Sequence, residues 1–332
     1  MNNLEEGIDF VITWVNADDE RWQHDFKSYM NDNESADARI LRYRDNQLLK
    51  YWFRGVEQFA PWVRKIHFVT YGHLPEWLNK SHEKLNIVKH EDYIDRKYLP
   101  TFNSHVIENN LHLIDGLSEH FVYFNDDFFI INKIEESYFF EKGRPKDCAI
   151  LNAVTPGGLS HIILNNLEVI NKNFKKNQVL KNNFFKWINI RYGANLLRTL
   201  CLLMWPSFVG IKDTHLPAPY VKKTFKEVWE AEEGLLKRTN ASRFRSLGDV
   251  NQYLFRYWQL VNGSFIVKNT LLDSVYMDIS THSLEQFEKA INNKKLKLIV
   301  INDGDVNNFE LITKGLDSVF SKKLPHKSKF EK

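Results

Sequence analysis

Two adjacent carboxylates follow a short apolar stretch near the middle of the chain. Residues 121–124 are aromatic or β-branched and predict a buried strand, and Asn125, Asp126 and Asp127 come directly after it. Carboxylates beside an apolar strand are costly to desolvate unless a cation or several hydrogen-bond donors compensate them. Such oxygen ligands suit Mg²⁺ or Mn²⁺, which takes its remaining ligands from water and substrate phosphates. An ordinary turn is the alternative, because Asn and Asp are common turn residues.

Two other places in the sequence carry residues that could do chemistry. Residues 296–301 predict the last strand, and Asn302 and Asp303 follow it as a second Asn-Asp pair. His215 lies in the Pro-punctuated loop 213–220. In open α/β sheets ligands bind beyond the carboxyl ends of the strands, which is where the carboxylate pair of the middle stretch would lie.

The surrounding pattern predicts an α/β fold that positions these residues. Apolar, β-branched runs alternate with amphipathic stretches in the manner of βαβ units. The predicted strands are 8–15, 65–71, 85–90, 121–124, 146–154 and 296–301, and the predicted helices in the first half are 45–59, 74–78 and 103–114. We expect a nucleotide-binding, GT-A-like mixed sheet flanked by helices, with a largely helical insertion.

The same pattern divides the chain into four segments. We expect residues 1–155 to form a nucleotide-binding α/β half and residues 156–260 to form a mainly helical insertion that includes the His215 loop. Residues 261–320 add strands and a helix that complete the α/β core. Residues 321–332, rich in Lys and His, are expected to be a flexible basic tail.

Composition restricts the class of protein. A hydrophobic content of 43% with 14% aromatic residues is ample for a globular core. The balance of 45 Lys and Arg against 42 Asp and Glu excludes a general nucleic-acid binder, although a local basic site for phosphates stays open. Two cysteines are too few for a disulfide framework or a zinc cluster and predict a reducing setting. With neither a secretion signal nor a spanning apolar run, we expect a cytoplasmic protein.

Residues 175–211 allow two interpretations. A basic, aromatic stretch is followed by the apolar run 194–211, which only Arg198 interrupts. Apolar residues flanked by lysines and tryptophans could dock on the inner face of the membrane as a peripheral contact. We favour the other interpretation, a helix buried in the protein.

Several long motifs together resemble the Stealth family. They are IDFVITWVNADD, RYRDN, APWVRKIHFVT, LPTFNS and YFNDDFF in the first half, and DTHLPAPY, RFRS and VIND in the second. They occur in the order of the family and span most of residues 8–303. Stealth proteins are sugar-phosphate transferases, among them bacterial capsule and cell-surface polysaccharide phosphotransferases and the catalytic part of the lysosomal-enzyme GlcNAc-phosphotransferase.

The resemblance implies a reaction and its participants. A hexose-1-phosphate unit passes from a UDP-sugar to a hydroxyl of an oligosaccharide or lipid-linked acceptor, which releases UMP and creates a phosphodiester. The first alternative is a metal-dependent glycosyltransferase, which transfers the sugar alone and releases UDP. The second is a non-catalytic nucleotide-sugar-binding subunit of an assembly complex.

Family and chemistry together imply roles for the reacting groups. The ligands of a divalent metal, Mg²⁺ or Mn²⁺, would be Asp126, Asp127, Asn302 and Asp303. His215 is the preferred general base for the acceptor hydroxyl, because imidazole titrates near neutrality. The planar fork of arginine suits phosphate, which makes candidates of Arg44, Arg243 and Arg245. Asp45 would orient Arg44 or act as an alternative base.

The remaining implied roles concern binding. Asp9, Trp14 and Asn16 are expected near the uridine and ribose, and Asn103 and Ser104 near sugar or phosphate. Some of these residues have a plain structural alternative: Trp14 as a core residue, Asn103 as a helix N-cap, and the three arginines as surface ion-pair partners.

Overall fold

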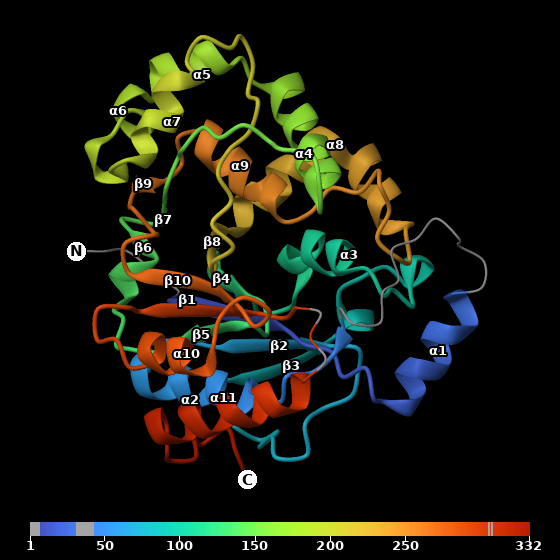
Figure 1. The fold of residues 1–332 in the computed structure, drawn as a ribbon. Coiled ribbons are helices and arrows are strands. Elements are labelled where there is room, and N and C mark those ends of the chain that lie inside the picture. Colours follow the sequence, from blue (N-terminus) through green and yellow to red (C-terminus); the bar gives the residue numbers. More distant parts are fainter. Residues whose placement is uncertain (1–6, 31–42, 305, 307) are drawn as a thin grey trace.

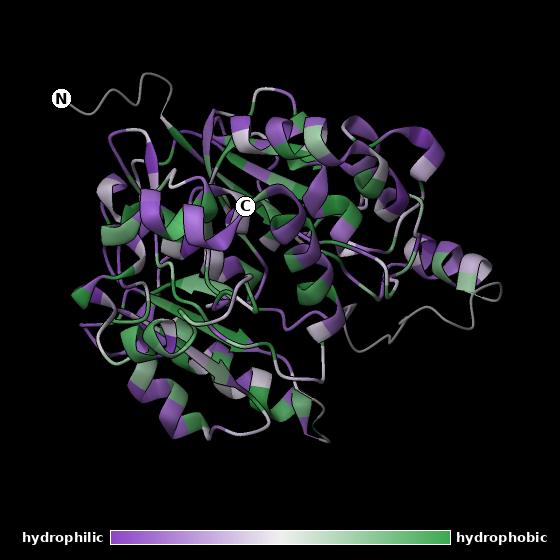
Figure 2. Ribbon diagram, turned by 90° about the horizontal axis from the view of Figure 1, so that it is seen from above, coloured by the Kyte–Doolittle hydropathy of each residue, from purple (hydrophilic) through white to green (hydrophobic). Residues whose placement is uncertain are grey.

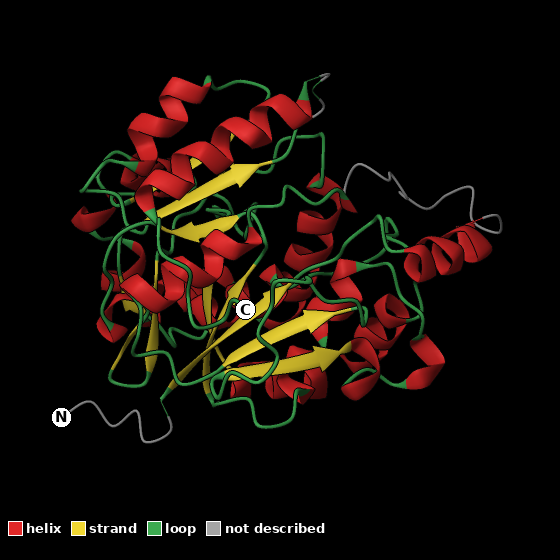
Figure 3. Ribbon diagram, turned by 90° about the horizontal axis from the view of Figure 1, so that it is seen from below, coloured by secondary structure: helices red, strands yellow, loops and turns green. Residues whose placement is uncertain are grey.

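A five-stranded sheet forms the centre of the computed structural model, which describes residues 7–30, 43–304, 306 and 308–332. Its strands, in spatial order, are β3 (Leu85–Lys89), β2 (Ile66–Thr70), β1 (Ile8–Thr13), β4 (His120–Phe124) and β8 (Ala218–Val221). The first four are parallel, and β8 pairs antiparallel to β4. Helices flank this sheet (Figure 3), so the predicted α/β class with a mixed sheet is confirmed.

A second, three-stranded sheet lies beside the first. It consists of β10 (Ser274–Asp278), β11 (Leu298–Asn302) and β5 (Phe128–Ile130), with β5 antiparallel to β11. A third, small sheet joins β6 (Phe140–Glu141), β7 (Arg144–Asp147) and β9 (Ile266–Val267). The chain passes from β4 in the first sheet to β5 in the second through residues 125–127, so the carboxylate pair occupies the crossing point.

The helices group by position. Outside the insertion they are α1 (Glu20–Met30), α2 (Leu49–Phe59), α3 (Ser104–Asn109), α10 (Leu284–Ile291) and α11 (Phe309–Lys323). The insertion contributes α4 (Ser160–Asn173), α5 (Lys176–Asn182), α6 (Phe184–Trp187), α7 (Asn195–Cys201), α8 (Lys222–Asn240) and α9 (Tyr253–Val261). Helices α5–α7 lie at the end of the molecule opposite α2 and α11 (Figure 1).

The central strands bury both of their faces. Phe10 and Ile12 pack in one cluster with α2 and α11, whereas Val11, between them, packs in a second cluster with α8 and α9. The strands are accordingly among the more hydrophobic parts of the ribbon (Figure 2). Gly55 lets α2 approach the second sheet, since a Cβ there would lie 2.5 Å from the carbonyl oxygen of Ile130.

Three expectations about local structure are wrong. Residues 74–78 form a turn and an isolated bridge to Glu331 instead of a helix. The strand predicted at 146–154 is β7, which already ends at Asp147. The tail 321–332 is not flexible, because Phe330 is buried in the main core and Glu331 forms a bidentate ion pair with Arg54 at 2.7 and 2.8 Å.

The helical insertion also differs from the favoured interpretation of its apolar run. Within 194–211 the helix α7 is only seven residues long, and much of the run is exposed. Strand β8 shows further that the insertion contributes to the central sheet. The segment boundaries given above stay predictions. No helix of the described residues has both the length and the apolar character needed to cross a bilayer.

Candidate active site

The two Asn-Asp tips predicted from the sequence lie next to each other. Asp127 ends the crossing from β4 to β5, and its backbone carbonyl accepts a hydrogen bond of 2.9 Å from the amide of Ile301 in β11. Asn302 ends β11, so Asn302 and Asp303 lie beside the β4 tip. Asn16 follows β1, the parallel neighbour of β4, and therefore reaches the same edge of the central sheet.

Negative charge gathers at this edge. Burial raises the pKa of Asp126 well above its usual value. The nearby charges of Asp127, Asp45 and Asp303 push that pKa in the same direction. The Oδ1 atom of Asp127 is buried and has no hydrogen-bond partner within the described part of the chain. A hard divalent cation would satisfy this oxygen and relieve the repulsion, so these residues fit one.

The described residues do not hold a closed metal cage. No three or more of their His, Cys, Asp and Glu side chains are grouped as ligands around one point. Mg²⁺ is commonly bound through one or two carboxylates, with water and substrate phosphates completing its shell. The adjacent carboxylates at the β4 tip match that open kind of site.

His215 lies over the Asp127 carboxylate. Its Nε2 atom is 3.5 Å from Asp127 Oδ2, and its side chain keeps 39% exposure. Its backbone φ is +46°, a left-handed conformation that residues other than glycine rarely adopt. The ring packs edge-on against Phe128 and Tyr276, with centroid separations of 5.1 and 5.5 Å. The imidazole is thus held between β5 and β10 while one side stays open to a substrate.

Tyr276 is a site residue that the sequence analysis missed. It lies on β10, a strand that was not predicted, so nothing located its aromatic ring near the site. Burial raises the pKa of its phenol to about 12, and the charges of Asp278 and Asp127 add to the shift. Asp278 in turn accepts a hydrogen bond from Asn302 at 2.6 Å. The available signal was the alternation of residues 274–278, which is typical of a strand.

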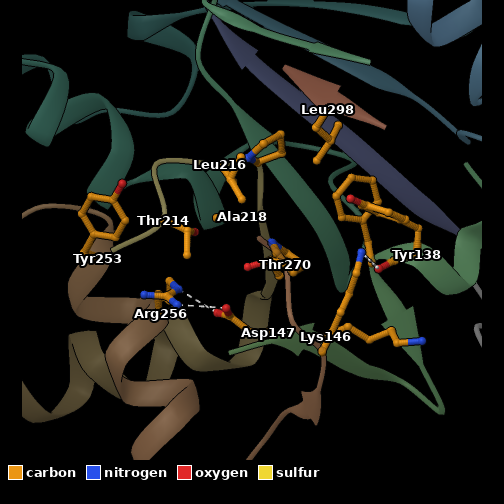
Figure 4. A pocket seen from close by; sticks show the side chains of 14 residues that line it. Tyr138, Lys146, Asp147, Thr214, Leu216, Ala218, Tyr253, Arg256, Thr270 and Leu298 are labelled. Atoms are coloured by element: carbon orange, nitrogen blue, oxygen red, sulfur yellow. Dashed lines mark hydrogen bonds and ion pairs between the residues drawn. The ribbon is translucent and has the colours of Figure 1, made fainter. Parts of the chain in front are cut away.

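A buried network of charged side chains holds Asp213, the first residue of the His215 loop. Arg256 of α9 donates to both oxygens of Asp147 at 2.7 and 2.9 Å and to Asp213 at 3.3 Å. Tyr257 donates to the other oxygen of Asp213 at 2.6 Å. Figure 4 shows Thr214 of the loop near the Arg256–Asp147 pair. The sequence signal for this network was the single charged residue in the otherwise uncharged stretch 253–261.

The titration of Asp213 makes the stability of the folded protein depend on pH. Burial raises its pKa from 3.8 to about 6, although Arg256 opposes the shift. The folded protein therefore holds this proton more tightly than the unfolded chain, and the resulting stability is lost as pH rises from about 4 to 6. We expect Asp213→Asn to gain stability relative to the wild type across that window, as measured by urea unfolding at a series of pH values. Parallel curves for the two proteins would contradict this, and Asp115→Asn, at an exposed position, is the control.

Arg44 is positioned by Asp303 instead of by Asp45. Its guanidinium donates to both oxygens of Asp303 at distances between 2.8 and 3.1 Å and packs 3.5 Å from the ring centre of Phe309. The expectation that Asp45 orients Arg44 is therefore wrong. Both oxygens of Asp303 accept hydrogen bonds from Arg44, and its expected role as a metal ligand stays a prediction. Asp45 accepts the amide of Gln47 at 2.9 Å, and its own burial raises its pKa.

The other two arginines have different surroundings. Arg245 donates to the hydroxyl of Ser104 at 2.8 Å, so two predicted site residues meet there. Arg243 donates to the carbonyl of Pro100 and lies over the ring of Tyr29 in α1. The structure thus places Arg243 against α1, and its expected contact with phosphate stays a prediction.

Asn103 is a structural residue. It is fully buried, and its side-chain oxygen accepts the amide of His105 as a helix N-cap. Its side-chain amide donates to the carbonyls of Ser242 and Phe244 and to Asp249. With every polar atom engaged inside the protein, the expected contact with sugar or phosphate is wrong and the N-cap alternative is confirmed.

Asp9 and Trp14 are also structural. Asp9 lies near the start of β1, at the other end of the strand from Asn16, and its carboxylate is fully buried. Burial opposes its ionisation, but hydrogen bonds from His67 and Arg64 outweigh burial and lower its pKa. Trp14 is buried and stacks on Phe68. The fully buried and paired carboxylate of Asp9 corrects its expected nucleotide contact. Trp14 fits the core alternative, and its nucleotide contact stays a prediction.

Phosphoryl-type transfer depends mainly on positioning and on stabilising charge at phosphate oxygens, and this edge combines carboxylates, a histidine and arginines suited to that chemistry. The fold and the site therefore define an α/β enzyme of the group-transfer class.

Comparison with known proteins identifies the family. The family model "Stealth protein CR2, conserved region 2" matches residues 42–147, a range that contains Asp126 and Asp127. A capsular polysaccharide phosphotransferase WcwK of Streptococcus pneumoniae is 44% identical over the full length of both chains. The exopolysaccharide phosphotransferase cps2G of Lactiplantibacillus plantarum is 39% identical over 98% of this chain and 96% of its own. The receptor polysaccharide phosphotransferase WefC of Streptococcus oralis is 37% identical over 98% and 99%. The chain belongs to the Stealth family and is a Stealth-type phosphotransferase.

Proposed function

We propose that this enzyme transfers a hexose-1-phosphate unit from a UDP-sugar to a hydroxyl of a growing surface polysaccharide or of its lipid-linked precursor. Phosphotransfer onto a polysaccharide is supported by the similarity, over essentially the whole chain, to three kinds of polysaccharide phosphotransferase. The observation that carries the chemical proposal is the His215–Asp127 contact at the junction of the two sheets. Because nucleotide sugars are cytosolic, the enzyme works at the inner face of the cytoplasmic membrane as a peripheral protein.

The proposed step is a displacement at the phosphorus that carries the sugar. His215 Nε2 accepts the proton of the acceptor hydroxyl, and Asp127 Oδ2, 3.5 Å away, stabilises the imidazolium that forms. The acceptor oxygen bonds to the β-phosphorus, the bond from this phosphorus to the bridging oxygen breaks, and the electron pair leaves on that oxygen as part of UMP. The product is a phosphodiester between the transferred sugar and the acceptor.

Charged side chains support this step from two sides. Asp126 and Asp127 would hold a divalent cation, Mg²⁺ or Mn²⁺, with Asn302 as a further candidate ligand, and the bound cation would neutralise charge on the pyrophosphate. Arg245 keeps guanidinium nitrogens beyond its bond to Ser104 and is assigned to phosphate. Arg44 is pre-oriented by Asp303 for the same task.

The nucleotide that is released tests the proposal. Purified protein is combined with Mg²⁺ or Mn²⁺, a panel of UDP-sugars and either an oligosaccharide or a lipid-linked acceptor, and the nucleotides are separated by chromatography. We expect UMP together with a phosphodiester-linked product, and loss of both after treatment with a chelator. Release of UDP would mean glycosyl transfer instead. Binding of a UDP-sugar without any released nucleotide would indicate a binding subunit.

A further inference from the structure

Large apolar side chains are exposed on one part of the helical insertion. Ten of the eighteen exposed large hydrophobic residues in the described structure lie between positions 159 and 205. The most exposed are Phe185, Ile190 and Met204, at 81, 88 and 87%. They belong to α6, the turn after it and the segment that follows α7. Such a concentration is unusual for a surface that faces only water.

The same stretch is basic without any acidic residue. Residues 169–212 contain eight Lys and Arg and no Asp or Glu, although the whole chain balances 45 against 42. Four of the eight are exposed and form no ion pair with a described residue: Lys175, Lys181, Arg191 and Arg198. An anionic surface would complement this charge, whereas an ordinary surface of mixed charge would not.

Buried groups hold the apolar residues outward. Trp187 and Tyr192 are fully buried, and they anchor the segment on which Phe185 and Ile190 are exposed. The ammonium of the buried Lys176 donates to the backbone carbonyls of residues 202, 203 and 205, which fixes the exposed segment after α7. The exposed apolar residues are therefore part of a defined structure and do not result from fraying.

We propose that residues 184–205, named here the apolar-basic face, dock on an anionic lipid bilayer. The apolar side chains would enter the interface between headgroups and acyl chains, and the flanking Lys and Arg would remain with the anionic headgroups. Each basic residue near such a surface strengthens binding by about fivefold. Figure 2, which views the molecule from the α5–α7 end of Figure 1, shows hydrophobic and hydrophilic residues interspersed there.

The location of this face gives it a role in catalysis. The chain runs from Trp205 to His215 in ten residues, so docking would hold the loop of the proposed base within about 35 Å of the membrane surface. This role rests on the proposed function, because only a lipid-linked acceptor would be presented there. Lipid binding itself does not depend on that function.

Flotation with vesicles tests the lipid contact. We expect the full chain to float with vesicles of phosphatidylcholine and phosphatidylglycerol at low salt, less at high salt, and hardly at all with phosphatidylcholine alone. The combined variant Phe185→Ser, Ile190→Ser, Met204→Ser should bind at least about tenfold more weakly. The matched control Leu247→Ser, Leu272→Ser, Leu311→Ser replaces side chains with 71, 75 and 70% exposure elsewhere and should bind like the wild type.

Two outcomes would overturn the proposal. One is equal flotation of the two triple variants, with far-ultraviolet circular dichroism confirming that both are folded. The other is a wild-type dimer in solution that the first variant dissociates, which would make the face a contact between copies of the chain. Turnover separates the two proposals: the first variant should keep its activity on a water-soluble oligosaccharide and lose it on an acceptor embedded in vesicles. Failure of the wild type to float with the anionic vesicles, while it still releases UMP, would likewise reject the docking surface and leave the proposed function standing.

Discussion

Asparagine at position 127 is expected to lower phosphotransfer by about a thousandfold without weakening the fold. The substitution keeps the shape of the side chain and removes the charge that faces His215 and that would hold the cation. It also removes one of the charges that raise the pKa of Asp126, so repulsion at the β4 tip decreases. The midpoint of thermal unfolding should therefore stay the same or rise while activity disappears. A steady-state assay of UMP release and a thermal melt measure the two effects.

A matched control separates charge at the site from charge in general. Asp115 is exposed in the connection before β4, and Asp115→Asn should leave both activity and melting temperature as in the wild type. If Asp127→Asn turned over at a near-normal rate, Asp127 would have to be removed from the mechanism. A lower melting temperature for Asp127→Asn would mean that its carboxylate stabilises the fold, contrary to its unpartnered oxygen.

Replacing His215 by alanine is expected to reduce the maximal rate by about 10²- to 10⁴-fold, because the acceptor hydroxyl loses its proton acceptor. The donor does not depend on this imidazole, so the KM for the UDP-sugar should change little. The backbone at His215 has a φ of +46°, which alanine tolerates poorly. His215→Asn is therefore the better second variant, since asparagine adopts this conformation more readily and has no comparable base. Initial rates at varied donor concentration give both parameters.

The control for this position is His326→Ala, which removes an exposed histidine far along the chain from the site. It should match the wild type in both kinetic parameters. A His215 variant with an unchanged maximal rate would transfer the role of base to another residue, and Asp45, half-buried with a raised pKa, would be the next to replace.

The parts of the site that could be predicted are those with local signals. The seven residues 121–127 predict both an apolar strand and its polar tip, which consists of Asn125, Asp126 and Asp127. The same holds for Asn302 after β11. Motif membership added His215, which has no local signal of its own. The meeting of the two tips depends on the antiparallel pairing of β5 with β11, a contact between residues about 170 positions apart that no local pattern reveals.

Other predictions about the chain were wrong because the burial of a residue depends on residues that are distant in the sequence. Asp9 belongs to a motif, but the residues that neutralise it, Arg64, His67 and Ser118, come from elsewhere in the chain and make it a structural anchor. The hydrophobicity of 194–211 predicted burial, yet no layer of the protein covers much of that stretch. Lysines around Phe330 suggested a solvated tail, but the burial of Phe330 and the ion pair between Arg54 and Glu331 fix the tail on the core.

The burial of Phe330 has a consequence for how the chain folds during its synthesis. Phe330 shares a hydrophobic cluster with Ile8 of the first strand, so the core joins residues from the two extremes of the numbered chain. During synthesis the apolar faces of the early strands stay exposed until the late segments leave the ribosome. Such long-range closure slows folding and favours aggregation of incomplete chains. Chaperones that bind nascent chains should therefore strongly affect how much active enzyme a cell accumulates.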